Sequence, residues 1–287
     1  MRRARQIFAA ASASLIAALL LTSCASTPDP QTTRDSLAEV TEDATPPEAD
    51  TTYDADLHPE PIVDPLECTR ILIITARGTG EPGKRQLLGP VVRAIADARP
   101  DQTQQLDLDY PADTDVKEGG TYGARLLIDT LNVQAEACPE QEFVLLGYSQ
   151  GALVIGDALS APEFRLVGTR VGEIGPEAQS RVRAIVFYGN PRFMGTEAYD
   201  SGSYTEWVNG LLPRPEGSLH TYADRIRDYC VSNDFVCQRS LELEDDGHIA
   251  YYENGMQQDG ASFVISLLPP IDGAFGEKPE DVDELVP

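Results

Sequence analysis

A serine between two glycines is the residue of this chain best placed to do chemistry. Ser149 lies in the segment Gly147–Gly151 (GYSQG), after the apolar run Phe143–Leu146 and before the helical pattern Ala152–Leu159. A turn from a strand into a helix strains the serine backbone, and the glycines let the next segment pack closely. The helix that follows directs its positive end toward the serine and any oxyanion beside it. We predict that Ser149 is a nucleophile.

The pattern G-x-S-x-G is common by chance, so the assignment needs a base and an acid elsewhere in the chain. The chain has only three histidines, His58, His220 and His248. Where a serine sits on this kind of turn, the acid follows it in the sequence and the histidine comes last. His58 lies in a polar N-terminal segment, and His220 precedes the candidate acid in a segment typical of a surface loop. We predict that His248 is the base.

The candidate acid is Asp234, which lies between Cys230 and Cys237. A disulfide between these two cysteines would close a small loop around the carboxylate and hold it in place. An ordinary surface acid is the alternative interpretation of Asp234. The competing candidates are Asp228, Glu242, Asp245 and Asp246.

The elements that must position these residues alternate between strand and helix patterns. The expected strands are Arg70–Ala76, Gln105–Tyr110, Phe143–Gly147 and Ala184–Tyr188. The expected helices are Leu87–Ala98, Gly119–Ala137, Gln150–Leu159 and Ala261–Leu268. Such alternation predicts an α/β domain with a mainly parallel central sheet between two helical layers. We place this single domain at residues 68–270, long enough for a proper core.

The loop after the first expected strand is rich in glycine. It reads Ala76–Gly83 (ARGTGEPG), and no Gly-Lys-Ser/Thr follows at the spacing of a phosphate-binding loop. Where a serine sits on a strand-to-helix turn, an early loop and the residue after the serine supply N–H groups for an oxyanion. Thr79 and Gln150 are therefore candidate donors, and a plain turn is the alternative for the loop.

Together these motifs resemble the cutinase family of serine esterases, a branch of the α/β hydrolases that includes fungal cutinases, acetylxylan esterases and actinobacterial cutinase-like proteins. The resemblance covers about Cys68 to Leu268. The matching segments are Gly147–Gly151, Ala76–Thr79, Ala137–Pro139 and the pattern Cys230-x3-Asp234-x2-Cys237 followed by His248.

The resemblance implies specific roles for these residues. It implies a triad of Ser149, Asp234 and His248 and an oxyanion hole formed by Thr79 and Gln150. It implies the disulfides Cys68–Cys138 and Cys230–Cys237. It also implies an exposed nucleophile without a large lid, and catalysis without a metal or another cofactor. The segment Thr196–Arg227 is longer than in the small fungal members and either shapes the substrate cleft or caps the core.

The first residues resemble an export signal followed by a lipid-attachment site. A basic start and the apolar run Ile7–Leu21 precede Leu21-Thr22-Ser23-Cys24, which is similar to the lipobox of bacterial lipoproteins. We predict a signal peptide at 1–23 and a Cys24 that carries acyl chains such as palmitate, which anchor the protein to the outer face of the cytoplasmic membrane. An ordinary signal peptide and a secreted protein is the alternative.

The cysteine count agrees with this interpretation. Five cysteines leave one unpaired, and a lipidated Cys24 would leave four, which allow three pairings. An exported protein favours disulfides over free thiols. No second close pair of cysteine or histidine residues suggests a zinc site.

Both ends of the chain are acidic and poor in apolar residues. We predict that 24–67 is a disordered tether and that 271–287 is an acidic tail. The formal net charge of −25 makes nucleic acid an unsuitable partner. We expect a monomer whose partners are an ester substrate and, through Cys24, a membrane.

Two other functions compete with an esterase acting on lipid, glycolipid or polyester substrates. A carbohydrate deacetylase similar to the acetylxylan esterases would use the same residues. A non-catalytic envelope lipoprotein would not require the set Ser149, Asp234 and His248 at all.

Overall fold

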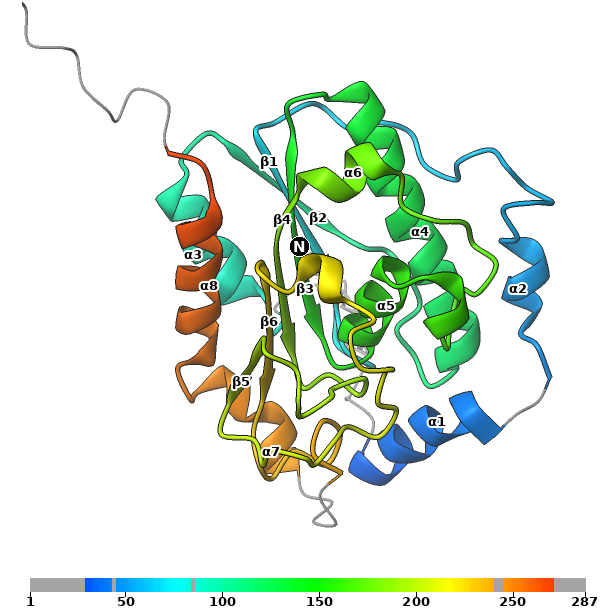
Figure 1. Cartoon of the computed structure of the whole chain (residues 1–287), viewed down its shortest axis with the longest axis vertical. Coiled ribbons are helices and arrows are strands. Elements are labelled where there is room, and N and C mark those ends of the chain that lie inside the picture. The colour runs from blue at the N-terminus through cyan, green and yellow to red at the C-terminus, as the bar shows by residue number, and fades with distance from the viewer. Residues whose placement is uncertain (1–28, 43–44, 84–85, 240–244, 271–287) are drawn as a thin grey trace, which may run out of the picture.

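A six-stranded parallel sheet forms the centre of the molecule (Figure 1). The computed structural model describes residues 29–42, 45–83, 86–239 and 245–270. The strands follow the order β2-β1-β3-β4-β6-β5 across the sheet. Their bounds are β1 Ile71–Ala76, β2 Thr103–Asp107, β3 Glu142–Tyr148, β4 Val182–Tyr188, β5 Asp200–Gly202 and β6 Ile226–Cys230.

Helices cover both faces of the sheet (Figure 1). Helices α3 (Gly89–Ala98) and α8 (Met256–Leu267) contact each other on one face, and α4 (Val116–Ala137) and α5 (Gln150–Leu159) contact each other on the opposite face. Neighbouring residues of a strand point to opposite faces, so β1 supplies alternate side chains to two apolar clusters. This three-layer α/β arrangement confirms the predicted fold class.

The two strands at one edge of the sheet, β5 and β6, were missed in the sequence. They lie in or directly after Thr196–Arg227, and β6 pairs with both β4 and β5. The segment therefore extends the sheet, while Trp207 on its surface is 75% exposed. The short helices α6 (Pro176–Arg181) and α7 (Asp245–Ile249) were also not predicted.

The expected disorder of the tether 24–67 is wrong for the part that the structure describes. Residues 30–42 form helix α1 (Pro30–Glu42), and α2 (Glu48–Thr52) follows. The segment 45–67 then runs along α4 and ends at Cys68, which forms a disulfide with Cys138 just after that helix. The acidic tail 271–287, the signal 1–23 and Cys24 lie outside the described residues.

Polar side chains of α4 explain why this segment is held despite its low apolar content. The buried guanidinium of Arg125 donates to the carbonyl oxygens of Tyr53, His58 and Glu60 and pairs with the carboxylate of Asp129. Other backbone N–H groups of the segment donate to the side chains of Glu118, Asp129 and Gln134. Hydrogen bonds with the helix side chains thus add to the few apolar contacts of the segment, which Tyr53 and Leu66 make. Among the described helices, none is long and apolar enough to cross a membrane.

Candidate active site

Ser149 occupies the tight turn between β3 and α5. Its backbone has φ 52° and ψ −119°, which an L-residue adopts only under strain. A Cβ on Gly151 would meet the carbonyl oxygen of Ala76 at 2.0 Å, and one on Gly147 would meet Cα of Ala152 at 2.7 Å. Both positions therefore require glycine, as the sequence predicted, and the turn presents the serine beyond the end of the sheet.

The structure brings Ser149, His248 and Asp234 together. The Ser149 Oγ lies 2.9 Å from Nε2 of His248, and Nδ1 of the same ring lies 3.0 Å from both carboxylate oxygens of Asp234. An ionised carboxylate can only accept, so Nδ1 carries a proton and Nε2 accepts the proton of the serine hydroxyl. This is the arrangement in which an imidazole can take a proton from a serine as it attacks.

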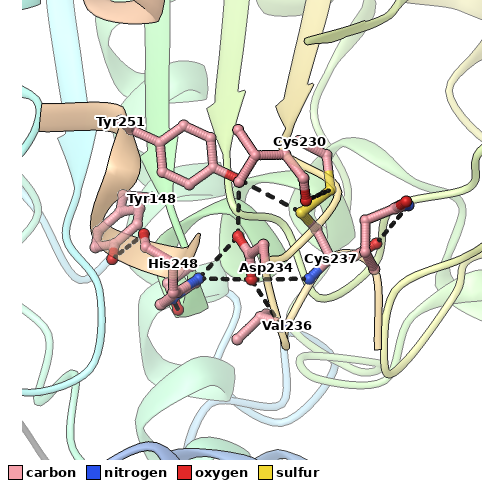
Figure 2. Close-up of polar contacts among 10 residues, drawn as sticks. Tyr148, Cys230, Asp234, Val236, Cys237, His248 and Tyr251 are labelled. Carbon is pink, nitrogen blue, oxygen red and sulfur yellow. Dashed lines mark hydrogen bonds and ion pairs between the residues drawn. A yellow bond between two sulfur atoms is a disulfide. The ribbon is translucent and has the colours of Figure 1, made fainter. Parts of the chain in front are cut away.

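Several donors converge on the carboxylate of Asp234, which follows β6 (Figure 2). The backbone N–H groups of Val236 and Cys237 donate to Oδ1 at 2.7 and 3.3 Å, and the phenol of Tyr251 donates to Oδ2 at 2.7 Å. A disulfide joins Cys237 to Cys230, so the loop that carries Asp234 is closed as the resemblance implied.

These donors decide the charge of Asp234. Complete burial raises the pKa of its carboxyl, but the charge of His248 and the hydrogen bonds from His248, Tyr251 and Val236 together outweigh burial. The net result is a pKa below the ordinary value for aspartic acid. The carboxylate therefore stays ionised and can stabilise an imidazolium beside it.

The two candidate oxyanion donors lie in contact with each other. The hydroxyl of Thr79 donates to the side-chain oxygen of Gln150 at 2.9 Å, and both residues are buried. Gln150 is the first residue of α5, where backbone N–H groups lack acceptors within the helix. Thr79 lies in the loop after β1, the neighbour of β3 in the sheet. The loop and the helix start thus meet beside Ser149.

Glu81 fixes the loop that carries Thr79, and the sequence analysis did not single it out. Its buried carboxylate accepts the N–H of Gly78 and the N–H of Leu87, both at 2.8 Å, and the phenol of Tyr252 at 3.0 Å. Burial raises the pKa of Glu81, and these hydrogen bonds oppose the rise. Its place inside the glycine-rich loop was the available signal.

Two tyrosines also escaped the sequence analysis. The ring of Tyr148 stacks on His248 with 5.1 Å between centroids, and its hydroxyl donates to the backbone oxygen of that residue at 3.0 Å. Tyr251 lies three residues after His248, and its hydroxyl donates to the same oxygen of Asp234 that the His248 ring contacts (Figure 2). Both lie close in sequence to predicted site residues, but an aromatic side chain at either position is equally typical of the hydrophobic core.

The competing residues lie elsewhere or have other partners. The carboxylate of Asp228 is buried and accepts from the side-chain amide of Asn190, and Asp246 is exposed. The exposed His220 contacts the carbonyl oxygen of Gly217. His58 is also exposed. Glu242 and the side chain of Asp245 lie outside the described residues, which contain no cluster of acidic, histidine or cysteine side chains suited to a metal ion.

Comparison with known proteins assigns this chain to a family. The family model described as Cutinase matches residues 67–268 of the chain, which is more than two thirds of its length. The chain belongs to the cutinase family. As a cutinase-family protein it belongs among carboxylic ester hydrolases.

Relatives in this family are named for several activities. A cutinase of Kineococcus radiotolerans is 34% identical over 70% of this chain and 62% of its own length. A phospholipase Culp4 of Mycobacterium tuberculosis is 30% identical over 70% of this chain and 80% of its own length. The catalytic core of an acetyl xylan esterase from Trichoderma reesei matches with a TM-score of 0.60 at 27% identity, over 70% of this chain and all of that domain.

Proposed function

We propose that this cutinase-family protein is a serine esterase in which Ser149, His248 and Asp234 form a catalytic triad. The observation that carries the proposal is the continuous line of hydrogen bonds from the serine hydroxyl through the imidazole to a buried, ionised carboxylate. The strained backbone of Ser149 at the start of α5 supports it, because this geometry positions the hydroxyl for attack.

The chemistry follows from that line of hydrogen bonds. His248 takes the proton of Ser149 as Oγ bonds to the ester carbonyl carbon, and it then gives this proton to the departing alcohol. Water attacks the acyl-enzyme with His248 as its base and releases the acid and the free serine. Asp234 holds the ring in the required tautomer and stabilises its cation.

An oxyanion hole completes the proposal. The backbone N–H groups of Thr79 and Gln150 donate to the oxygen on which negative charge develops, and the N-terminus of α5 adds its positive potential. The hydroxyl-to-amide hydrogen bond between the two residues and the carboxylate of Glu81 keep these donors aligned before substrate arrives. Losing one such donor typically raises a barrier of this kind by about 2.7–4 kcal/mol.

The direct test is Ser149→Ala. We expect this variant to keep its melting temperature and to lose hydrolysis of p-nitrophenyl butyrate by roughly 10⁴-fold or more, because the nucleophile itself is removed. A fluorophosphonate probe should label the native chain at Ser149 and leave the variant unlabelled. Near-native activity in the variant would refute the assignment, and an inert native chain would favour a non-catalytic lipoprotein.

The proposed substrates are lipid, glycolipid or polyester esters at the cell envelope. The proposal is supported by a relative named as a phospholipase and by the similarity of Leu21–Cys24 to a lipobox, which would place the enzyme at a membrane surface. Mass spectrometry of the exported protein should detect the acyl chains on Cys24. Comparing the lipids of a deletion strain with those of the wild type would identify the natural ester.

A carbohydrate deacetylase is the second candidate, favoured by the acetyl xylan esterase structures that match the fold. The two candidates share every catalytic residue and differ in the acyl group that they remove. A series of p-nitrophenyl esters from acetate to palmitate separates them. A maximum at acetate would favour the deacetylase, and rates that hold or rise with chain length would favour the lipid esterase.

A further inference from the structure

The proposed nucleophile is covered in this structure. Ser149 is only 2% exposed, and its partners His248, Thr79 and Gln150 are buried as well. The resemblance implied an exposed serine, and an ester carbonyl must reach its Oγ to react. An element that packs over this end of the sheet would have to move for a bulky ester to reach that atom.

Helix α1 reaches Phe235 with one side chain and packs against α4 with its other side. On one side the guanidinium of Arg34 lies 6.0 Å from the ring centroid of Phe235, and that ring lies 5.2 Å from His248. On the other side α1 contacts α4, and the two helices enclose a hollow with the loop before α4. The residues that line this hollow are Thr32, Asp35, Ser36, Glu39, Val40 and Thr114–Lys117.

The order of the strands places Ser149 between these two sides. All strands are parallel, so the segments that follow β2, β1, β3, β4 and β6 all emerge at the C-terminal end of the sheet, side by side in that order. The loop before α4 follows β2, and Phe235 follows β6. Between them lie the Thr79 loop after β1 and Ser149 after β3. Four strand spacings amount to about 19 Å, and a helix with its side chains is about 10–12 Å wide, so one helix fits between the two sides. Figure 1 shows α1 at the same end of the sheet as α7, which carries His248.

The buried face of α1 carries the apolar side chains of Leu37 and Val40 beside the hydroxyl groups of Thr33 and Ser36. Leu37 is fully buried and Val40 is 5% exposed, and both belong to the same apolar cluster as Ala112, Val116 and Phe235. The opposite face carries exposed polar residues such as Glu39 and Thr41. An apolar wall beside a nucleophile is suited to the hydrocarbon part of a substrate.

We infer that helix α1 is a lid over Ser149. In the closed form Leu37 and Val40 of α1 occupy the binding site for a long acyl chain, and the bound acyl chain displaces the helix. The inference rests on the proposed function, because it names the substrate class of the same serine. A ligand shifts this equilibrium only if it binds the open form better than the closed form. A long acyl chain binds the open form better because it covers the apolar surface that is exposed when Leu37 and Val40 move away. An acetyl or methyl group is too small to cover this surface.

The test on the unaltered chain is hydrogen exchange measured by mass spectrometry over residues 30–42. Ser149 is first modified with ethyl p-nitrophenyl dodecylphosphonate or with the matching methylphosphonate. In each reaction Oγ bonds to phosphorus, p-nitrophenolate leaves and His248 takes the serine proton. We expect the dodecyl adduct to lose the protection of α1, and the methyl adduct to regain it after labelling.

A second test loosens the lid by mutation. The double variant Leu37→Ser with Val40→Ser should react with the methylphosphonate, and hydrolyse p-nitrophenyl butyrate in solution, roughly tenfold or more faster than the wild type. Thr41→Ala, on the exposed face of the same helix, is the matched control and should keep the wild-type rates.

The outcomes separate the lid from the esterase. If the dodecyl adduct forms at Ser149 but α1 stays as protected as in the methyl adduct, the lid is refuted and the esterase stands. If no phosphonate labels Ser149 in any of these proteins, the esterase and the lid fail together. The exchange measurement uses the native sequence, so it decides the question even if the double variant does not fold.

Discussion

At the residue scale, the site depends on keeping a fully buried carboxylate ionised. Burial alone would raise the pKa of Asp234, yet the net pKa lies below the ordinary value because the His248 cation and hydrogen-bond donors to both oxygens favour the carboxylate. A group whose pKa is lower in the folded than in the unfolded protein adds stability above its unfolded pKa. That contribution disappears as the pH falls through the folded value.

Asp234→Asn tests both consequences. The amide cannot fix the productive tautomer of His248, so we expect kcat/KM for p-nitrophenyl butyrate to fall by about 10⁴-fold. We also expect a lower free energy of unfolding than the wild type at pH 7, with the difference shrinking below about pH 4 as the native carboxylate is protonated. Urea unfolding at pH 7 and pH 3 measures this.

Asp246→Asn is the control for that experiment. This acid is exposed and lies only two residues from His248, so its loss should leave activity and unfolding nearly unchanged. Equal losses in the two variants would show that any nearby negative charge suffices and would contradict the role of Asp234.

At the scale of elements, sequence patterns located what apolar burial dictates. Strands β1, β3 and β4 are nearly continuous apolar runs, and α5 follows its strand directly, so the turn at Ser149 could be found. Strand β6 was missed because Arg227 and Asp228 interrupt its apolar pattern. Asp228 is buried although its side chain is ionisable, and only the fold reveals Asn190 beside it.

The β5–β6 edge carries a pH dependence of its own. Burial first, and then the charge of Asp228, raises the pKa of Asp200 to about 9, and burial raises that of Asp228 to about 7. The neighbouring charges are Glu197, which raises both pKa values, and Arg214, which lowers both. The folded state therefore binds protons that the unfolded state has released, and the free energy of unfolding falls as the pH rises from about 4 to 9.

Asp200→Asn should flatten this decline. The amide keeps an oxygen for the backbone N–H of Glu197, which donates to Asp200 at 3.1 Å, and it removes the charge that repels Asp228. We expect its melting temperature at pH 9 to exceed that of the wild type by roughly 4 °C or more, with little difference at pH 5. The control is Asp224→Asn, whose side chain is 85% exposed and whose curve should follow the wild type. Parallel pH curves for Asp200→Asn and wild type would exclude the edge as the origin of the decline.

At the scale of the whole molecule, local motifs were enough to select candidate site residues. Composition, in contrast, led to the wrong expectation of disorder for the described part of 24–67. The order of Ser149, Asp234 and His248 pointed to a site because their types and spacing encode its chemistry. The fold of 45–67 was not visible, because it depends on side chains of α4 more than 60 residues away. A much greater distance along the chain hid the position of α1 beside Phe235.

Arg125→Ala tests whether that segment is part of the folded domain. The change removes the donors to the carbonyl oxygens of Tyr53, His58 and Glu60 and leaves the carboxylate of Asp129 without its cation. Breaking a buried pair in this way typically costs about 3–5 kcal/mol, and hydrogen exchange should accelerate throughout 53–66.

Arg170→Ala is the matched control, because Arg170 also pairs with a residue of the segment 45–67. Its side chain is 59% exposed and pairs with the buried carboxylate of Asp54, which also accepts the backbone N–H of Asp56. We expect its loss to cost less than the loss of Arg125, because solvent screens the exposed guanidinium and a backbone donor remains on the carboxylate. Denaturant unfolding of the two variants compares them directly. If Arg125→Ala were no more destabilised than Arg170→Ala, the segment would be bound only loosely to α4. A clear excess for Arg125→Ala would make 45–67 an integral layer of the domain, fixed at one end by the Cys68–Cys138 disulfide and preceded in the chain by helix α1.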